Sequence, residues 1–309
     1  KGGAIALLTT TRAVYAISNA ALVRTVYDSL FQKTNCANPR LGDVCRSSKD
    51  NFAFSPNLSN ARKFLLVGDP SIQIAIPSGN VETTKINGHL TKSGVGDTLS
   101  ALQKVSIEGR VLSCSGQLLD DFNGKLYVTI FDKAKDYKTL AQDKGSVVTS
   151  FSLQKNVIFK GVASVEKGLF SFSFVVPKDI DYKYGLGKIS YYAENGTDLD
   201  AAGYYDKIVI GGTATNPISD DTPPVVNVFL NDENFVKGGI TEANPVLLAK
   251  ISDDLGINIT GSSIGHDLTA VIDENTQGEI ILNDFFESEL NNPAKGTVRY
   301  PLKDIAPGV

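Results

Sequence analysis

The stretch ARKFLLVGDPSIQIAIP, residues 61–77, limits the fold of this chain more than any other. The apolar run Phe64–Val67 stops at Gly68-Asp69-Pro70, and residues 71–77 then alternate between isoleucine and smaller or polar residues. An unbroken apolar run is typical of a strand buried on both faces, whereas alternation indicates a half-buried strand. Because proline cannot donate to a strand ladder, Pro70 stops the first strand from continuing. The stretch therefore predicts the end of one domain, a turn, and a strand leading to the next.

The first 79 residues alternate between strand and helix patterns. Residues 4–10 form an apolar run that predicts another strand buried on both faces. Apolar residues then recur at helical spacing over 18–31, with Ser18 or Asn19 as the expected N-cap, and a second helix is predicted over 40–50. Strands and helices in this order indicate an α/β segment with a mainly parallel sheet over residues 1–79.

From residue 80 onward the pattern changes to short segments rich in β-branched and aromatic residues, separated by turn residues. These segments predict an antiparallel β-sandwich over residues 80–215. A polar, proline-containing linker follows at 216–224. Residues 225–309 predict a second, immunoglobulin-like sandwich, which we expect to be truncated because it offers about four candidate strands where about seven are needed. We therefore expect an internal segment of a larger multidomain polypeptide.

Composition and isolated polar residues exclude several classes of function. The net charge of −4 and the scattered basic residues argue against nucleic acid as a partner. No apolar run approaches the roughly 20 residues of a transmembrane span. The two histidines, His89 and His266, are too few for a histidine-based metal site. No motif supports a cofactor. Asp253 and Asp254 are candidate calcium ligands at the end of a strand, but a turn role is favoured for both.

The three cysteines, Cys36, Cys45 and Cys114, have no spacing typical of a metal site. Cys36 and Cys45 can form a disulfide or remain two thiols, and the sequence leaves both alternatives open. Cys114 lies in a β segment, where a free cysteine is expected as a small buried apolar residue. Cys45 lies in a predicted helix beside Arg46, and a plain helix-surface thiol is favoured over a reactive one. No catalytic residue is assigned to this chain.

Two segments of the α/β region resemble a known family. GGAIALLTTTRAVYAISNAAL (2–22) and FLLVGDPSIQI (64–74) are similar to the end of the caspase-like catalytic domain of gingipain-type cysteine peptidases. Two longer β stretches, 175–212 and 220–258, resemble the sortase branch of that family, which belongs to the type IX secretion system. The resemblance covers nearly the whole chain.

The resemblance implies the function of the parent protein. Enzymes of this branch remove C-terminal signal domains from secreted cargo proteins and attach the product to anionic lipopolysaccharide. They act at the cell surface, on the outer membrane, together with other type IX secretion components. The family's catalytic histidine and cysteine both precede the strand that opens this sequence. The segment is therefore expected to supply scaffold and pocket edge, with no nucleophile of its own.

The resemblance also implies a site in the loop after strand 4–10. Loops at the carboxyl ends of α/β strands commonly hold ligands. Thr11, Arg12 and Tyr15 are the predicted substrate-binding residues, because Tyr15 falls next to the position of an aromatic pocket residue in the family. The alternative is that Tyr15 packs beneath the following helix. The Gly68-Asp69-Pro70 turn is expected near this site as structural support.

A different class of protein remains as the second hypothesis. In this alternative the chain is a non-catalytic β-sandwich protein of the binding or adhesin type, and the α/β segment has no role in the function. Buried parallel strands at 4–10 and 63–67 favour the peptidase hypothesis, because an adhesin array does not need them.

Overall fold

The chain divides into two compact units, residues 1–78 and 79–309. The first unit ends one residue before the boundary expected from the sequence. Among the described residues, no helix is both long and apolar enough to cross a membrane. His266 and residues 220–221 of the predicted linker lie outside the described residues. The computed structural model describes residues 3–34, 36–51, 58–91, 97–219, 222–260, 267–273 and 278–305.

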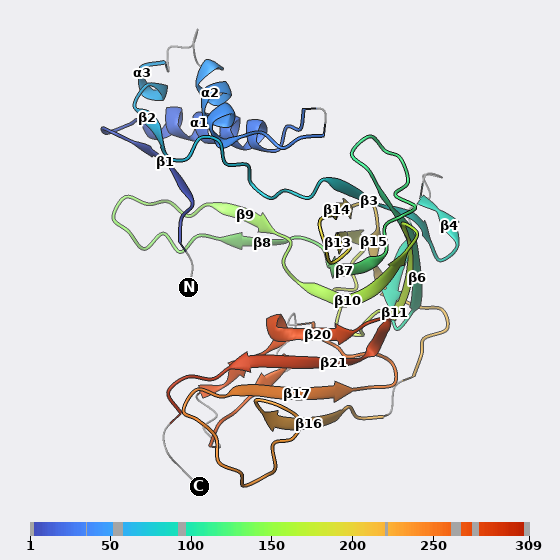
Figure 1. Ribbon diagram of the computed structural model, residues 1–309. Coiled ribbons are helices and arrows are strands. Elements are labelled where there is room, and N and C mark those ends of the chain that lie inside the picture. Colours follow the sequence, from blue (N-terminus) through green and yellow to red (C-terminus); the bar gives the residue numbers. More distant parts are fainter. Residues whose placement is uncertain are drawn as a thin grey trace. The chain divides into compact units, whose positions relative to one another are not determined.

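The first unit combines two strands with three helices (Figure 1). Leu22 of α1, Ala61 of α3 and Phe64 of β2 form its buried core, with Leu8 of β1 packed against them. The elements in chain order are β1 (Ala6–Thr10), α1 (Ala16–Leu30), α2 (Leu41–Asp50), α3 (Leu58–Ala61) and β2 (Phe64–Gly68).

The predicted parallel arrangement of the two strands is wrong. β1 and β2 pair antiparallel, with Ala6 opposite Gly68 and Thr10 opposite Phe64. They are also not buried on both faces, because Leu7 is 54% and Val67 52% exposed. An apolar run indicates a strand but carries no information on its direction, which depends on how the intervening helices return the chain.

Both predicted helices are present, but the first begins at another residue. Tyr15 is the N-cap of α1 and makes no capping hydrogen bond with its side chain. Ser18 and Asn19 lie inside the first turn of α1, so the N-cap prediction is wrong. The start of α1 is instead tied to α3, because the backbone N–H of Tyr15 donates to Asn60 Oδ1 at 3.1 Å.

The turn after β2 has the predicted local geometry, whereas the strand after it is absent. Gly68 has φ +132°, and a Cβ there would lie 3.0 Å from Ala6 Cβ, so only glycine fits without strain. Residues 71–77 alternate in burial as expected, yet they form no strand. The carbonyl of Ile72, for example, accepts from the N–H of Leu41 at the start of α2 at 2.8 Å.

The second unit begins with a barrel instead of the predicted sandwich. Eight strands follow one another in the order β14-β13-β7-β10-β11-β6-β3-β4. β14 also pairs in parallel with β3, with Ala201 opposite Gly79, and this pairing closes seven of the strands into a barrel. Their bounds are β3 (Gly79–Ile86), β4 (His89–Leu90), β6 (Lys104–Leu112), β7 (Gly124–Phe131), β10 (Val157–Glu166), β11 (Leu169–Val175), β13 (Lys188–Glu194) and β14 (Asp200–Tyr205).

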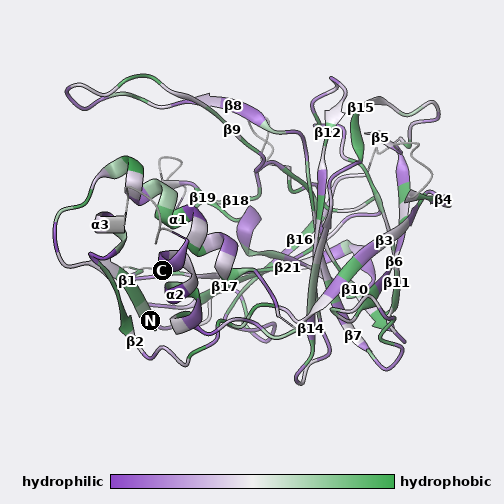
Figure 2. Ribbon diagram, turned by 90° about the horizontal axis from the view of Figure 1, so that it is seen from above, coloured by the Kyte–Doolittle hydropathy of each residue, from purple (hydrophilic) through white to green (hydrophobic). Residues whose placement is uncertain are grey.

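Buried and more exposed residues alternate along β6 and β7, so that every second side chain fills the barrel. Figure 2 shows hydrophobic and hydrophilic residues interspersed along the barrel strands. The interior holds one continuous apolar core that includes Val105, Ile107, Leu126, Ile130 and Ile189, all at most 1% exposed. Alternation is shared by sandwiches and barrels, because both have one face on the core. The sequence pattern therefore indicated β structure in this region but did not distinguish the two architectures.

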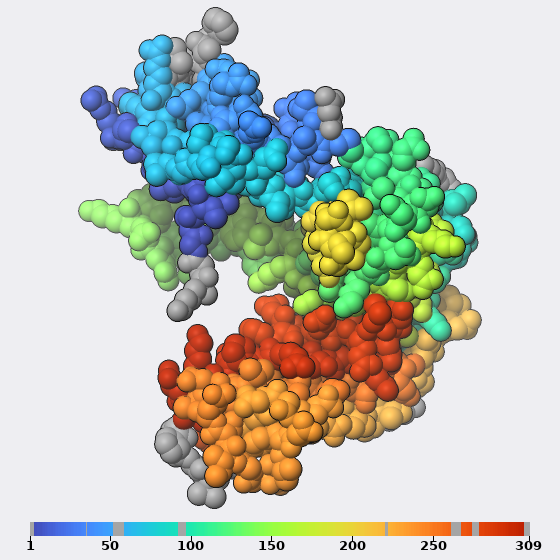
Figure 3. Space-filling model, viewed as in Figure 1, coloured from blue at the N-terminus to red at the C-terminus, as the bar shows by residue number. Residues whose placement is uncertain are grey.

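Small sheets and a long hairpin extend from the barrel. The hairpin β8–β9 projects outward (Figures 1 and 3) and exposes apolar side chains such as Leu140 and Val147, which are 78% and 75% exposed. The remaining elements are β5 (Thr98–Ala101), β12 (Gly185–Leu186) and β15 (Val209–Thr213) in one sheet, and β8 (Lys135–Lys138) with β9 (Ser150–Leu153) in the hairpin.

The C-terminal part of the second unit is an antiparallel sheet in the order β16-β17-β21-β20. Val298, Phe286 and Ala249 lie in its core. The described residues add only the small sheet β18–β19, so the immunoglobulin-like sandwich over 225–309 stays a prediction. The elements are β16 (Val225–Leu230), β17 (Val246–Ser252), β18 (Thr269–Ala270), β19 (Ile280–Ile281), η3 (Asn283–Phe285), β20 (Phe286–Glu289) and β21 (Asn292–Pro301).

Two barrel tyrosines, Tyr127 and Tyr191, are expected to lower the stability of the fold at alkaline pH. Burial, followed by the hydrogen bond to Glu194, raises the pKa of Tyr127 to about 12. Burial also raises the pKa of Tyr191 above its usual value. Both groups stay neutral in the folded chain after the unfolded chain has begun to ionise near pH 10. Their contribution to stability is thus complete below about pH 10 and is lost as the pH rises towards 12.

We expect the urea midpoint to fall between about pH 10 and pH 12, and to fall less steeply for Tyr191→Phe. Tyr191→Phe also removes a hydrogen bond to Thr83 Oγ1, 2.8 Å long, so the slopes of the two profiles are compared and not their absolute values. A Tyr191→Phe profile as steep as that of the parent would contradict the prediction.

Candidate functional site

The loop Thr11–Tyr15 connects β1 to α1, and contacts from the segment before β2 hold it at both ends. The N–H of Thr11 donates to the carbonyl of Lys63 at 2.9 Å, and Thr11 Oγ1 donates to the same oxygen at 3.3 Å. At the other end, the N–H of Tyr15 donates to Asn60 Oδ1. The loop therefore has a defined backbone position, although the side chains of Thr11, Arg12 and Tyr15 are exposed.

The side chain of Tyr15 faces solvent. It is 73% exposed, which disagrees with the alternative that it packs beneath α1. The Lys63 ammonium lies 5.6 Å from the centroid of the Tyr15 ring, and it also donates to the carbonyl of Ala13 at 2.9 Å. Arg12 is exposed in the same loop. An aromatic ring with a cation over it, next to a guanidinium, suits a partner with apolar and acidic groups.

Asn60 and Lys63 were not identified from the sequence. Asn60 is 1% exposed, and its Oδ1 fixes the backbone of Tyr15. Its Nδ2 has no hydrogen-bond partner among the described residues. Both residues stand far from the loop in the sequence and reach it only through the antiparallel pairing of β1 and β2, so no local signal predicts them.

The predicted turn residues lie apart from this loop. The register of β1 and β2 places Gly68 opposite Ala6, at the start of β1, whereas the loop follows Thr10 at its end. Four residue steps separate the two positions, or about 13 Å of strand. Asp69 is exposed and accepts from the Ser71 hydroxyl at 2.7 Å and from its N–H at 2.8 Å, and these bonds lower its pKa. Asp69 thus stabilises its own turn.

The cysteines and histidines form no catalytic group in the described part of the chain. Cys45 is a free thiol, so the possible Cys36–Cys45 disulfide is excluded. Cys36 and Cys114 are both disulfide-bonded, so the expectation that Cys114 is a free buried thiol is wrong. His89 is exposed, and its Nδ1 lies 3.0 Å from Asp97 Oδ1. No group of three or more possible metal-binding side chains occurs among the described residues.

Comparison with known proteins relates the first unit to a peptidase family. Residues 1–75 match the model of Peptidase family C25, the family of the gingipain-type cysteine peptidases. The chain is also similar to PorU from Porphyromonas gingivalis, known from a crystal structure of its dimeric latent form. The identity is 30%, with a TM-score of 0.49, and the match covers 91% of this chain and 26% of PorU. The family match confirms the resemblance to gingipain-type peptidases that the motifs at 2–22 and 64–74 predicted.

A second solved structure is much less similar to this chain. The sporulation control protein Spo0M from Bacillus subtilis is 10% identical, with a TM-score of 0.26, over 57% of this chain and 67% of that protein. No curated protein sequence matches the chain. The chain spans about a quarter of the length of PorU, 26%.

Proposed function

We propose that this chain is a non-catalytic segment of a cell-surface cysteine peptidase of the sortase type. The observation that supports it is the loop Thr11–Tyr15, which lies within the residues that match family C25 and presents the exposed Tyr15 ring from a backbone held by Asn60 and Lys63. In this proposal Tyr15 and Arg12 border the substrate pocket. The barrel and the C-terminal sheet act as scaffold and docking surfaces.

The proposed chemistry belongs to the parent enzyme. A thiolate supplied by another part of the parent attacks the scissile carbonyl, and a histidine there protonates the leaving amine, which gives an acyl-enzyme. Water resolves the acyl-enzyme by hydrolysis, whereas an amine nucleophile resolves it by transpeptidation. The substrates are cargo proteins whose C-terminal secretion signals are removed, and the acceptor is anionic lipopolysaccharide. The parent works at the outer membrane with other type IX components.

Substitution of Tyr15 in the full-length parent tests the pocket assignment. For Tyr15→Ala we expect kcat/KM on peptide substrates to fall about 10- to 100-fold, which corresponds to losing one apolar contact in a specificity pocket. Tyr15→Phe keeps the ring and should stay within about threefold. Asp69→Asn, in a turn at the other end of the β1–β2 ladder, is the control and should leave kcat/KM unchanged. Equal values for Tyr15→Ala and the parent would overturn the assignment.

The second test concerns the missing nucleophile. The 309-residue chain by itself is expected to release no product from peptides that the full-length parent cleaves, measured with a fluorogenic substrate under reducing conditions. Its Cys45→Ser variant is the matched control, because Cys45 is the free thiol of the described residues. Cleavage that disappears on Cys45→Ser would show that the chain carries its own nucleophile.

A further inference from the structure

The hairpin formed by β10 and β11 opens into a fork. The two strands pair only beside their turn, with Val165 opposite Phe170 and Glu166 opposite Leu169. Beyond these two pairs, β10 continues along β7 and β11 continues along β6 without pairing with each other. The barrel wall therefore has a gap between β10 and β11.

The C-terminal sheet occupies the β10 side of this gap. The N–H of Val162 donates to Ser288 Oγ at 2.9 Å, and the N–H of Ser164 donates to Asn291 Oδ1 at 2.7 Å. In return the N–H of Asn291 donates to the carbonyl of Val162 at 2.8 Å. The β20–β21 turn thus replaces β11 as the hydrogen-bonding partner of β10.

The β11 side of the gap has no such partner among the described residues. Just before β11 the N–H of Val111 donates to the carbonyl of Gly168, and just after it the N–H of Val176 donates to the carbonyl of Gln103. In this register the even-numbered residues of β11 are the ones that bond to β6. In an antiparallel ladder the residues between them direct their N–H and C=O groups to the opposite edge. Ser171, Ser173 and Val175 therefore present donors and acceptors to the gap, the arrangement that accepts an added strand.

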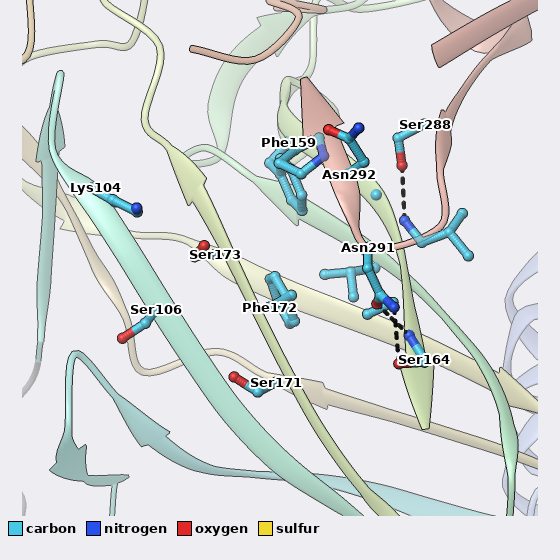
Figure 4. Close-up of a pocket in the computed structure, with 15 residues that line it drawn as sticks. Lys104, Ser106, Phe159, Ser164, Ser171, Phe172, Ser173, Ser288, Asn291 and Asn292 are labelled. Carbon is cyan, nitrogen blue, oxygen red and sulfur yellow. Dashed lines mark hydrogen bonds between the residues drawn. The ribbon is translucent and has the colours of Figure 1, made fainter. Parts of the chain in front are cut away.

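A groove of about 560 Å³ runs along this edge. Figure 4 shows Ser171 and Ser173 on one side of it and Ser164, Asn291 and Ser288 on the other, with Phe172 between them. The rings of Phe159 and Phe172 stack with their centroids 5.9 Å apart. Lys104 is the one charged residue of the lining, and it is exposed.

We propose that this groove binds an extended polypeptide segment that bears an acidic residue. The segment adds as a strand to β11, through the backbone groups of Ser171, Ser173 and Val175, which is the β-augmentation mode of peptide recognition. The phenylalanine rings contact side chains on one face of the bound segment. The lone positive charge of Lys104, with no carboxylate in the lining, selects the acidic residue.

Hydrogen exchange on the 309-residue chain tests the backbone contact. The probe is an eight-residue peptide of alternating threonine and valine with one central glutamate, blocked at both ends. Without the probe, the amides of Ser171 and Ser173 should exchange rapidly, whereas that of Phe172, bonded to β6, should be protected. At saturating probe, exchange at Ser171 and Ser173 should slow at least about tenfold, the effect of one stable backbone hydrogen bond. Slow exchange before the probe is added, or no change after it, would overturn the proposal.

N-methylated probes test the strand geometry without altering the protein. Methylation at alternate residues blocks the donors on one edge of the peptide. One of the two alternate sets should weaken binding more than about tenfold, and the other set less than about threefold. Equal effects of both sets would contradict strand addition at β11.

Variants of Ser173 separate the backbone from the side chain. Ser173→Pro removes an N–H that does not bond to β6, and proline is tolerated at such edge positions of a sheet. The variant should lose binding of the probe and keep the circular dichroism spectrum of the parent chain. Ser173→Ala retains the N–H and should bind as the parent does. If the chain dimerises with increasing concentration and Ser173→Pro abolishes this dimerisation, the β11 edge binds a second copy of the chain. That result would overturn the proposal.

The acidic preference has its own test. Replacing the probe glutamate by glutamine should weaken binding about two- to fivefold, as for an exposed ion pair. The difference should vanish in Lys104→Gln. Equal binding of the two probes to the parent chain would refute the role of Lys104.

Discussion

Replacing Asp132 by alanine is expected to lower the free energy of unfolding of the 79–309 unit by about 3–5 kcal/mol. Asp132 follows β7 and is 1% exposed. Its Oδ1 accepts from Lys133 Nζ at 2.7 Å, and its Oδ2 accepts from the N–H of Asp181 at 3.2 Å. Without the carboxylate, the Lys133 ammonium, whose side chain is 12% exposed, loses its counter-charge in a largely dry site.

The exposed pair of Glu233 and Lys250 is the matched control. It is equally short at 2.6 Å, but its side chains are 56% and 40% exposed. Glu233→Ala should cost less than about 1 kcal/mol. Urea unfolding can be followed by tyrosine fluorescence, because the chain has 11 tyrosines and no tryptophan. Equal losses for Asp132→Ala and Glu233→Ala would show that burial does not control this ion pair.

Gly203→Val is expected to destabilise the barrel by about 3 kcal/mol, at the upper end for overpacked sites. Gly203 of β14 lies at the seam where β14 meets β3. A Cβ at this position would overlap the carbonyl oxygen of Val81, which is backbone and cannot move without opening the seam. Gly79, across the seam, is similarly crowded, since a Cβ there would lie 2.9 Å from Ala201 Cβ. These small residues let the two strands approach.

Ala202→Val, at the adjacent residue, is the control for Gly203→Val. Ala202 is half-buried, and valine is favoured in strands, so we expect a change within about 0.5 kcal/mol. Urea midpoints measure both variants, and hydrogen exchange of the β3 and β14 amides shows whether the seam has opened. Undiminished stability of Gly203→Val would mean that the barrel does not depend on this contact.

Local patterns predicted the two main helices and the β-rich character of the second unit. Helical spacing predicted α1 and α2, and the segments rich in β-branched and aromatic residues predicted β structure from residue 80 onward. The Gly68-Asp69-Pro70 turn was also predictable, because positive φ and side-chain capping are properties of individual residues. The strand predicted at 71–77 is absent because its alternation reflects half-burial alone, and a strand also needs a backbone partner.

The candidate site could be predicted only in part. Thr11, Arg12 and Tyr15 lie within five consecutive residues, so one sequence motif predicts all three as site residues. Asn60 and Lys63 reach the loop through the pairing of Thr10 with Phe64, a contact across more than fifty residues. The same antiparallel register moves Gly68 away from the loop, where a parallel sheet had been expected.

The sequence by itself determined the two main helices, the β-rich character of the second unit and the resemblance of the first unit to family C25, because periodicity, turn residues and motifs are local. The tertiary structure alone decided the direction of β2, the closure of the barrel at Gly79 and Gly203, and the fork between β10 and β11. These features depend on which backbone edges meet, and an edge presents the same N–H and C=O groups whatever its side chains are. Packing of distant segments, not local pattern, selects among the possible pairings.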